Sequence, residues 1–594
     1  MDAYLSEPVD NLGFSADAKS RRYATERYRG AVGRNWYTCD PTLQFLMRFY
    51  LGREGAEWAA PHLERVGALM GGPIAERAEE TDRNPPRLEK YDRWGHDTSR
   101  IVMPRTFEDS KRDLLSSSFG SPAFADEARR AGVDVRPLTT AWSYMLNQAE
   151  IGMTCALGTG DDMVVRMAER YAPEEVKARV RELFASGEMA GEAAQLFTER
   201  TGGSDLGAME TTATWDGAVW RLNGFKWFVS NANGSAYVVL AKPLGATDDT
   251  RGVAPFLVLR ETADGRRNGI RVRRLKDKLG TKAVASAEVE LVDAEAYLLA
   301  PGGPGAEGTE EERSAGDGRG LARMMELTNG ARLGIALMGV GCARRALVES
   351  LCYATAREAF GAPLADHPLM QRKLAEMVVE VEAAQAIVFD GYLGGRLRLA
   401  PALVKLRAAR LGITAASDAI EIHGGNGYIE QWPVARILRD AQVNTVWEGP
   451  DNILCLDVKR AVTKQQAHLE LLDRLRAAAG RAPEGDDATA CAVADHVERL
   501  ERAVEAWARL DPPVAEARLY PLAQYMADVY SAAMLLEQAG FERSELHSDR
   551  KALLARLYVR AHLGDRGPLR GIDEPAEDLA RFKELLDGAF AWDG

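Results

Sequence analysis

The sequence predicts an α+β protein of several domains: a helical N-terminal domain, a central antiparallel β-barrel domain, and a C-terminal four-helix-bundle domain followed by extra helices. Three observations support this prediction. Apolar residues recur every three or four positions through most of residues 1–180, as they do on one face of a helix. Alternating and β-branched runs then dominate residues 189–300, and helical spacing returns after residue 320. A chain of 594 residues is also too long for one hydrophobic core.

The changes in periodicity divide the chain into five segments. Residues 301–320 contain almost nothing apolar and many glycines and acids, which is typical of a mobile surface loop. The predicted segments are an N-terminal helical domain with an extension (1–187), a β-barrel domain (188–305), an acidic glycine-rich loop (306–320), a helical bundle (321–480) and an additional helical region (481–594).

Finer features can be predicted within these segments. Residues 84–97, NPPRLEKYDRWGHD, are rich in turn-forming residues. After the acidic loop, long runs of helical spacing predict four helices, over residues 321–358, 367–397, 400–423 and 450–475.

Composition and charge exclude several classes of protein. No run of about 18 apolar residues occurs, and the N-terminus lacks the basic and then apolar pattern of a signal peptide, so we expect a cytoplasmic protein without a membrane span. The net charge of −13 argues against nucleic acid as the main partner. Six scattered cysteines without a C-x-x-C pair predict neither a disulfide framework nor a metal site.

Common nucleotide-binding and hydrolase motifs are missing. No G-x-G-x-x-G follows a predicted strand, and the chain has no phosphate-binding P-loop, H-E-x-x-H or G-x-S-x-G. A Rossmann-type nucleotide site is therefore not supported.

Two motifs in the β segment carry candidate ligand contacts. LFTERTGGSD (196–205) places the hydroxyls of Thr198 and Ser204 around a glycine turn, where a backbone without Cβ atoms can approach a flat ring or a phosphate. GFKWFVSNAN (224–233) is an aromatic strand that could form the wall of a planar ligand site. Taken singly, the first motif also fits an ordinary β-turn and the second an ordinary core strand.

Further candidates lie in the helical segment. Asn329 and Arg332 lie near the start of one helix, and Arg357 precedes a Phe360-Gly361 turn. Arginine offers a rigid fork of donors for pyrophosphate, although a surface arginine near a helix C-terminus is the simpler interpretation.

Glu448, between Trp447 and Gly449, is a candidate base. Removing its carboxylate from water would raise the pKa, although most Glu-Gly steps are exposed turns. The glycines of the 424–427 turn, Gly-Gly-Asn-Gly, allow close backbone approach to a ligand. His423 beside them fits a buried, hydrogen-bonded side chain better than a catalyst.

Together, and in this order, the motifs resemble the acyl-CoA dehydrogenase family over about residues 140–460. The matching patterns are T-E-x-x-x-G-S-D, G-x-K-x-[WF]-[IV]-[ST]-N, R-x-x-F-G, G-G-x-G followed by R-D, and the base-bearing E-G turn. The words LTNGARL, HPLM and VNTVWEGPDNILCLDV, the early NPPRLEKYD segment and the two terminal extensions are most similar to the AidB-like branch of that family.

The resemblance implies a helix, β-barrel, helix subunit with FAD at a subunit interface, in a homotetramer that is a dimer of dimers. It implies α,β-dehydrogenation of a fatty acyl-CoA, with Glu448 taking the α proton, hydride passing to flavin N5 and electrons leaving to an electron-transfer flavoprotein or another acceptor. The implied flavin contacts are Phe197, Thr198, Gly203, Ser204, Phe228, Ser230, Arg357, Phe360, Glu421, Gly424, Gly425 and Asn452. The implied substrate contacts are Ser204, Asn329, Arg332 and Gly449.

Three positions depart from the family pattern, and two other functions compete with dehydrogenation. Glu421 and Pro368 stand where the family has glutamines, and Pro450 replaces a frequent hydroxyl. The first alternative is an AidB-like flavoprotein associated with DNA protection, but residues 461–594 hold 17 Lys and Arg against 24 Asp and Glu, and a net charge of −7 repels phosphates. The second alternative is an acyl-CoA oxidase, a group that usually has longer chains.

Overall fold

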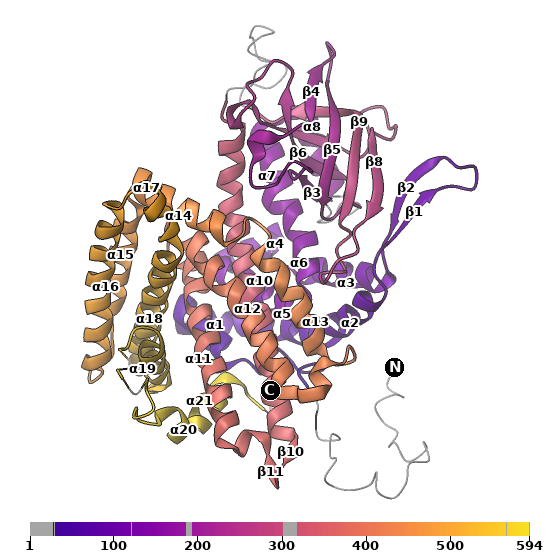
Figure 1. Cartoon of the computed structure of the whole chain (residues 1–594). Coiled ribbons are helices and arrows are strands. Elements are labelled where there is room, and N and C mark those ends of the chain that lie inside the picture. The colour runs from indigo at the N-terminus through magenta and orange to yellow at the C-terminus, as the bar shows by residue number, and fades with distance from the viewer. Residues whose placement is uncertain are drawn as a thin grey trace, which may run out of the picture.

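The computed structural model describes residues 28, 30–119, 121–185, 193–300, 318–565, 567–568 and 570–592. The fold class predicted from the sequence is confirmed: helices come first, then a β-barrel, then helices again (Figure 1). Most of the predicted acidic loop, residues 306–317, lies outside the described residues.

The N-terminal domain is built on long helices, with one element that the sequence analysis did not predict. In the stretch interpreted only as turn-rich, β1 (Arg87–Tyr91) and β2 (Asp97–Val102) form a hairpin that projects from the body in Figure 1. Lys90 Nζ fixes it to the barrel by donating to Val272 O over 2.7 Å. The helices are α1 (Pro41–Leu69), α2 (Ala75–Arg83), α3 (Arg105–Ser117), α4 (Pro122–Arg130), α5 (Val135–Ala149), α6 (Ile151–Thr159), α7 (Arg166–Tyr171) and α8 (Glu174–Ala185).

The middle domain is a closed barrel. Its ring of hydrogen-bonded strands runs β6, β4, β5, β9, β7 and back to β6, with β8 on β9 and β3 on β6. Most pairs are antiparallel as predicted, but β3 and β4 each pair with β6 in parallel. The strands are β3 (Ala193–Leu196), β4 (Thr212–Trp215), β5 (Trp220–Val229), β6 (Ala236–Pro243), β7 (Ala254–Leu259), β8 (Ile270–Leu275) and β9 (Ala287–Leu298).

The C-terminal bundle is built around one long helix, α10, which runs from the barrel to the far end of the molecule (Figure 1). The prediction of a single helix over 450–475 is wrong. Gln466 has a φ of +49°, and this left-handed residue ends one helix and turns the chain into the next. The helices are α10 (Gly320–Ala356), α11 (Pro368–Leu393), α12 (Ala400–His423), α13 (Pro433–Ala441), α14 (Asp451–Gln465) and α15 (Ala467–Ala479).

The extra C-terminal helices pack on the outer side of this bundle, with α18 against α11, α12 and α14 (Figure 1). Buried charges join the two regions: the Glu382 carboxylate on α11 pairs with Arg550 and, over 2.9 Å, with Lys551. The remaining helices are α16 (Asp487–Ala508), α17 (Pro512–Ala517), α18 (Leu519–Leu546), α19 (Arg550–His562), α20 (Glu577–Ala580) and α21 (Phe582–Ala589).

Three hydrophobic cores form among the described residues. One runs continuously through the N-terminal helices, the bundle and the extra helices, and a second fills the barrel. A third joins the outer face of β6 and β7 to α7, α8 and the start of α10. The interior of the barrel is thus packed separately, while its outer face rests on helices. Among the described helices, none is both long and apolar enough to cross a bilayer.

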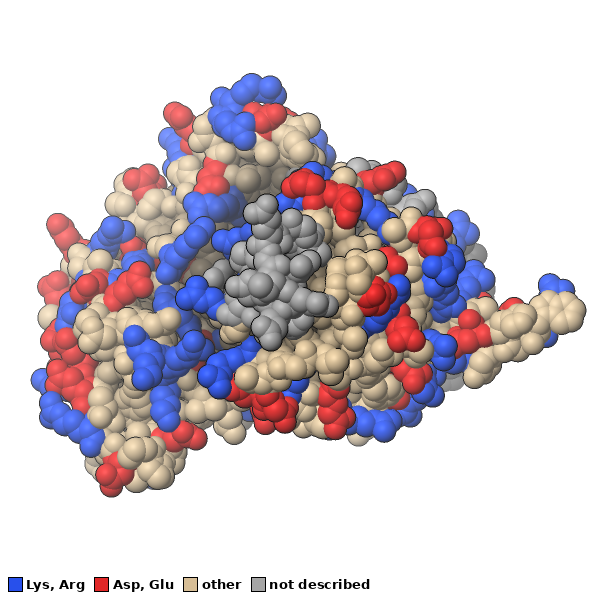
Figure 2. All heavy atoms as spheres, turned by 90° about the horizontal axis from the view of Figure 1, so that it is seen from above, with Lys and Arg blue, Asp and Glu red and all other residues tan. Residues whose placement is uncertain are grey.

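Charge is unevenly distributed over the surface. Figure 2 shows Lys and Arg side chains gathered to the left of the residues not described, while Asp and Glu side chains lie to their right and along the rim. A negative total charge therefore coexists with a locally positive surface, which an anionic ligand could approach.

Candidate active site

Glu448 lies in a strained turn between α13 and α14. Its φ is +55° and that of Gly449 is +100°, so two successive residues are left-handed. A Cβ added to Gly449 would come within 3.0 Å of Ile453 Cγ2, so the space and the backbone angle both favour glycine there. Strain of this kind persists only when neighbouring groups hold the backbone in place, and it concentrates at functional sites.

The Glu448 carboxylate reaches across to the barrel. Gln195 Nε2, on β3, donates to Glu448 Oε1 over 2.7 Å, although the two residues are 253 positions apart in the chain. Burial raises the pKa of Glu448 above its ordinary value of 4.5, and the Gln195 hydrogen bond and the nearby cations Arg332 and Lys405 oppose that rise. The result is a carboxylate with the enhanced basicity expected of a general base.

Two buried cations hold the backbone of the Glu448 turn. Arg332 Nε, on α10, donates to Glu448 O over 3.3 Å, and Lys405 Nζ, on α12, donates to Gly449 O over 2.7 Å. Burial lowers the pKa of Lys405 to about 8. Both cations contact backbone carbonyls, so they fix the turn without neutralising the Glu448 carboxylate directly.

The predicted substrate contacts on α10 have partners inside the protein. Arg332 Nη1 lies 3.2 Å from Asn329 Oδ1 and 2.8 Å from Asp457 Oδ2. Asp457, on α14, also pairs with Arg398 over 2.6 Å. Arg332 thus hydrogen-bonds the backbone of the Glu448 turn. Its contact with a substrate stays a prediction.

The predicted flavin-side motifs of the barrel come together. Trp227 N donates to Thr198 O over 2.8 Å, which joins the segment after β3 to the end of β5. A Cβ added to Gly203 would lie 2.7 Å from Thr198 Oγ1, so the glycine turn folds back on that hydroxyl. Ser230 Oγ, one residue beyond β5, lies 3.2 Å from Ser286 Oγ, and Phe228 is 53% exposed. Gly203 and Ser204 are also exposed, and Phe197 is half-buried beside Thr198.

Glu199 has a structural role within this motif. Its buried carboxylate accepts from Lys226 Nζ over 2.6 Å, from Thr211 Oγ1 over 2.5 Å and from Glu210 N over 2.6 Å. Burial raises the pKa of Glu199, but the pairing with Lys226 and these hydrogen bonds outweigh it and hold the pKa below the ordinary value. The pair locks the glycine turn onto the barrel.

A second group of predicted flavin contacts lies at the opposite end of the bundle. Arg357 ends α10, and β10 (Glu358–Ala359) and β11 (Ala362–Pro363) form a short hairpin with Phe360 at its turn (Figure 1). At 1.5 Å per residue, Arg357 lies roughly 38 Å along α10 from Arg332. A single chain therefore does not bring Arg357 and Phe360 close to the flavin-side motifs of the barrel.

The remaining predicted flavin contacts are open to solvent. Phe360 is 98% exposed, and Glu421 is also exposed, 3.6 Å from Lys373 Nζ. Gly424 and Gly425 are exposed, and a Cβ added to either would meet nothing within 4 Å. Asn452, at the first turn of α14, is exposed as well.

His423 is a core residue, as its simpler interpretation predicted. Its ring is 2% exposed, stacks on Tyr353 at 4.2 Å between centroids, and has Nδ1 2.7 Å from Ala419 O. Burial lowers the pKa of His423, so the ring is neutral at physiological pH. It supports the Gly-Gly turn from within the core.

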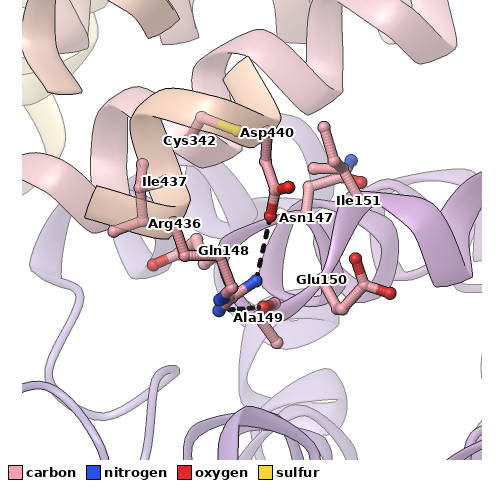
Figure 3. Close-up of a pocket in the computed structure, with 9 residues that line it drawn as sticks. All are labelled: Asn147, Gln148, Ala149, Glu150, Ile151, Cys342, Arg436, Ile437 and Asp440. Carbon is pink, nitrogen blue, oxygen red and sulfur yellow. Dashed lines mark hydrogen bonds and ion pairs between the residues drawn. The ribbon is translucent and has the colours of Figure 1, made fainter. Parts of the chain in front are cut away.

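A small polar cavity lies elsewhere, where α5, α10 and α13 meet (Figure 3). Its volume of about 10 Å³ suits one water molecule and neither a flavin nor an acyl thioester. Arg436 crosses it, donating to Asp440 Oδ2 over 3.0 Å and to Ala149 O over 2.9 Å. Burial, and then the Asp440 charge, raise the pKa of Glu150 to about 7. The residues around it are Asn147, Gln148, Ala149, Glu150, Ile151, Cys342, Arg436, Ile437 and Asp440.

Sequence analysis missed Gln195, Lys405 and Asp457. Gln195 precedes the recognised T-E motif by three residues but belongs to none of the patterns. Lys405 and Asp457 lie in segments predicted only as helices, with no role given to either side chain. The one available signal was Lys405 directly after the apolar run PALV, because buried lysines are rare unless they have a partner.

A helical domain, a barrel and a helical bundle, with a half-buried carboxylate where the barrel meets the bundle, define a class of protein. Comparison with known proteins identifies that class. Residues 194–294 match the acyl-CoA dehydrogenase middle domain, residues 318–463 its C-terminal domain, and residues 29–185 the N-terminal domain of the adaptive response protein AidB. The chain belongs to the acyl-CoA dehydrogenase family.

Individual relatives support this assignment. The putative acyl-CoA dehydrogenase AidB of Escherichia coli K12 is 30% identical over 71% of this chain and 77% of its own. Caenorhabditis elegans ACDH-11, solved in complex with C11-CoA, shares the fold with a TM-score of 0.80 over 98% of both chains, at 24% identity. An acyl-CoA dehydrogenase of Bacillus anthracis, solved with FAD, has a TM-score of 0.62 over 82% of this chain and 83% of its own, at 20% identity.

Proposed function

We propose that this protein is an FAD-dependent acyl-CoA dehydrogenase that oxidises the bond between the α and β carbons of a fatty acyl-CoA. The observation that carries the proposal is the hydrogen bond from Gln195 to Glu448, because it brings the candidate base to the strand that leads into the flavin-side motif. Family membership supports the reaction class, and the relative solved with C11-CoA supports an acyl-CoA ligand.

The described residues fit FAD. Phe228 and Phe360 are large exposed aromatics that a planar ligand would cover. The open space beside Gly424 and Gly425 lets a ligand approach the protein backbone closely. Phe197, Thr198, Gly203, Ser204 and Ser230 would hold the ring, and Arg357 with Phe360 would hold the pyrophosphate and adenosine of another subunit's cofactor. FAD, when bound, supplies the hydride acceptor.

The separation of the two groups supports an assembly of several copies. They lie at opposite ends of α10, so a second chain is needed to bring Arg357 and Phe360 to the barrel motifs. We propose that two chains complete each other's sites and that the protein assembles as a homotetramer.

In this proposal Glu448 removes the α proton of the thioester. Its raised pKa makes the carboxylate a better proton acceptor, and the left-handed turn, held by Arg332 and Lys405, fixes its direction. Ser204, Asn329 and Gly449 are the further candidates for binding the acyl-CoA.

The proposal is tested by adding acyl-CoAs of increasing chain length to the purified yellow protein without oxygen. We expect loss of the flavin absorbance with at least one thioester, and slow recovery in air, because we propose a separate protein as the electron acceptor. Fast recovery in air would identify an oxidase instead. Absence of bleaching by every thioester would refute the proposed reaction.

The rate of bleaching should depend on pH. Because Glu448 acts as a base only when ionised and burial raises its pKa, the rate should fall as the pH drops through a value above 4.5. Stopped-flow measurement across pH 3.5–9 gives the midpoint. A midpoint at or below 4.5 would contradict a desolvated base.

Lys405→Met should weaken catalysis without removing the base. The variant loses the charge-assisted hydrogen bond to Gly449 O and lets the turn relax, so we expect a roughly 10- to 100-fold lower bleaching rate. The flavin content should be unchanged. Lys464→Met, at an exposed position of α14, is the matched control, and an unchanged rate in Lys405→Met would show that the lysine does not hold the base in place.

A further inference from the structure

The contact between Gln195 and Glu448 follows from the alternation of β3. Ala194 and Leu196 point into the barrel core, so the side chain between them points to the other face. Parallel pairing with β6 places Gln195 beside Val238 and fixes its position along the sheet. Gln195 is therefore held by the barrel, whereas Glu448 is held by the bundle.

Gln195 is the hydrogen-bond partner of the Glu448 carboxylate among the described residues. Arg332 and Lys405 donate to the backbone carbonyls of the turn. A cation bound directly to the carboxylate would keep it ionised and make it a poor base, while an apolar neighbour would leave a buried charge without any donor. A neutral amide avoids both extremes.

The amide oxygen of Gln195 makes no hydrogen bond to a described residue. Gln195 Oε1 is buried and has no hydrogen-bond partner within the described part of the chain. An amide carries two donors and one acceptor oxygen, so rotation of the two groups lets the same side chain accept a hydrogen bond from a carboxylic acid. Gln195 can thus bind Glu448 in either protonation state, but the hydrogen bond from Nε2 to the ionised carboxylate is charge-assisted and stronger, so the contact favours the ionised form.

We propose that Gln195 is a positioning residue for proton transfer: it holds one oxygen of Glu448 and leaves the other to take the α proton of the substrate. This inference rests on the proposed function. The C–H bond at the α carbon would break and an O–H bond would form on Glu448. The electron pair left on the α carbon would become the second bond of the α,β double bond, as the β hydrogen leaves with its own bonding pair as hydride for the flavin.

The test compares Gln195→Met, Gln195→Glu and Gln538→Met in the FAD-loaded protein. Gln538, on α18, is 2% exposed and also has its Oε1 without a partner in the described structure, so it controls for the loss of a buried glutamine. The pH dependence of anaerobic bleaching is measured for each variant with the most active acyl-CoA.

Gln195→Met should move the acid limb of the rate upwards by about one to two pH units, because one hydrogen bond to a charged group has about that effect. At pH values below the shifted midpoint, the rate of Gln195→Met should be at least about tenfold lower than that of wild type at the same pH. On the alkaline plateau it should stay within about threefold of wild type. Gln195→Glu should move the limb further, since two carboxyl groups then share a proton. An unmoved limb, or the same loss at every pH, would overturn the proposal.

A second measurement does not depend on acyl-CoA. The protonated carboxyl band of Glu448 in the infrared spectrum, identified by its loss in Glu448→Gln, is titrated in wild type and in Gln195→Met. A higher midpoint in Gln195→Met supports the coupling even if no thioester bleaches the flavin, a result that would refute only the proposed reaction. Equal midpoints would refute the role of Gln195.

Discussion

Glu448→Gln should lower the rate of flavin bleaching by at least about 10²- to 10⁴-fold, the range for loss of a positioned general base. Glutamine has almost the same shape and can keep a hydrogen bond to Gln195, so the turn should remain folded. The amide cannot take a proton from carbon at neutral pH. Single-turnover mixing with the most active acyl-CoA measures the effect.

A matched control separates this effect from the loss of any carboxylate. Glu505, exposed on α16 and 3.6 Å from Arg509 one helical turn away, should tolerate Glu505→Gln without a change in rate. Flavin content and melting temperature should match wild type in both variants. A rate in Glu448→Gln within about threefold of wild type would remove Glu448 from the reaction.

The second large effect concerns stability. Glu382 is fully buried on α11 and pairs with Arg550 and Lys551 of α19. Glu382→Gln removes the charge and leaves two buried cations without their counter-ion, which costs about 3–5 kcal/mol. Denaturant unfolding should show this loss in the transition that involves the C-terminal helices.

Acid should weaken the same ion-pair cluster by protonating Glu382. Burial alone would raise the pKa of Glu382, but Arg550 and Lys551 lower it to about 2 from 4.5. The stabilisation is therefore fully present above pH 4.5 and is lost as the pH falls towards 2, and Glu382→Gln should lack this component of the pH dependence.

Glu498→Gln is the control for this substitution. Glu498 pairs with Arg476 over 3.0 Å but is 54% exposed, so its loss should change stability by only about 0–1 kcal/mol. Equal effects of the two substitutions would show that the buried cluster does not anchor the C-terminal helices to the bundle.

The site was predictable where its residues belong to local motifs. The glycine turn after β3, the aromatic strand β5 and the Glu448 turn were all found, because each combines residues within about ten positions. Gln195 and Lys405 were not found, since a single amide or amine acquires its role only from a neighbour far along the chain. The substrate contacts of Asn329 and Arg332, implied by resemblance, stay predictions.

The sequence alone determined the order of the helical and β domains, because hydrophobic periodicity is a property of neighbouring residues; α10 begins at Gly320 and ends at Ala356, close to the predicted 321–358. Only the tertiary structure decided the break at Gln466, the projecting hairpin and the meeting of β3 with the Glu448 turn. The Gln195–Glu448 contact joins residues 253 positions apart, and Lys90 anchors the hairpin to Val272, 182 positions away. Local patterns carry no information about which distant surfaces will meet.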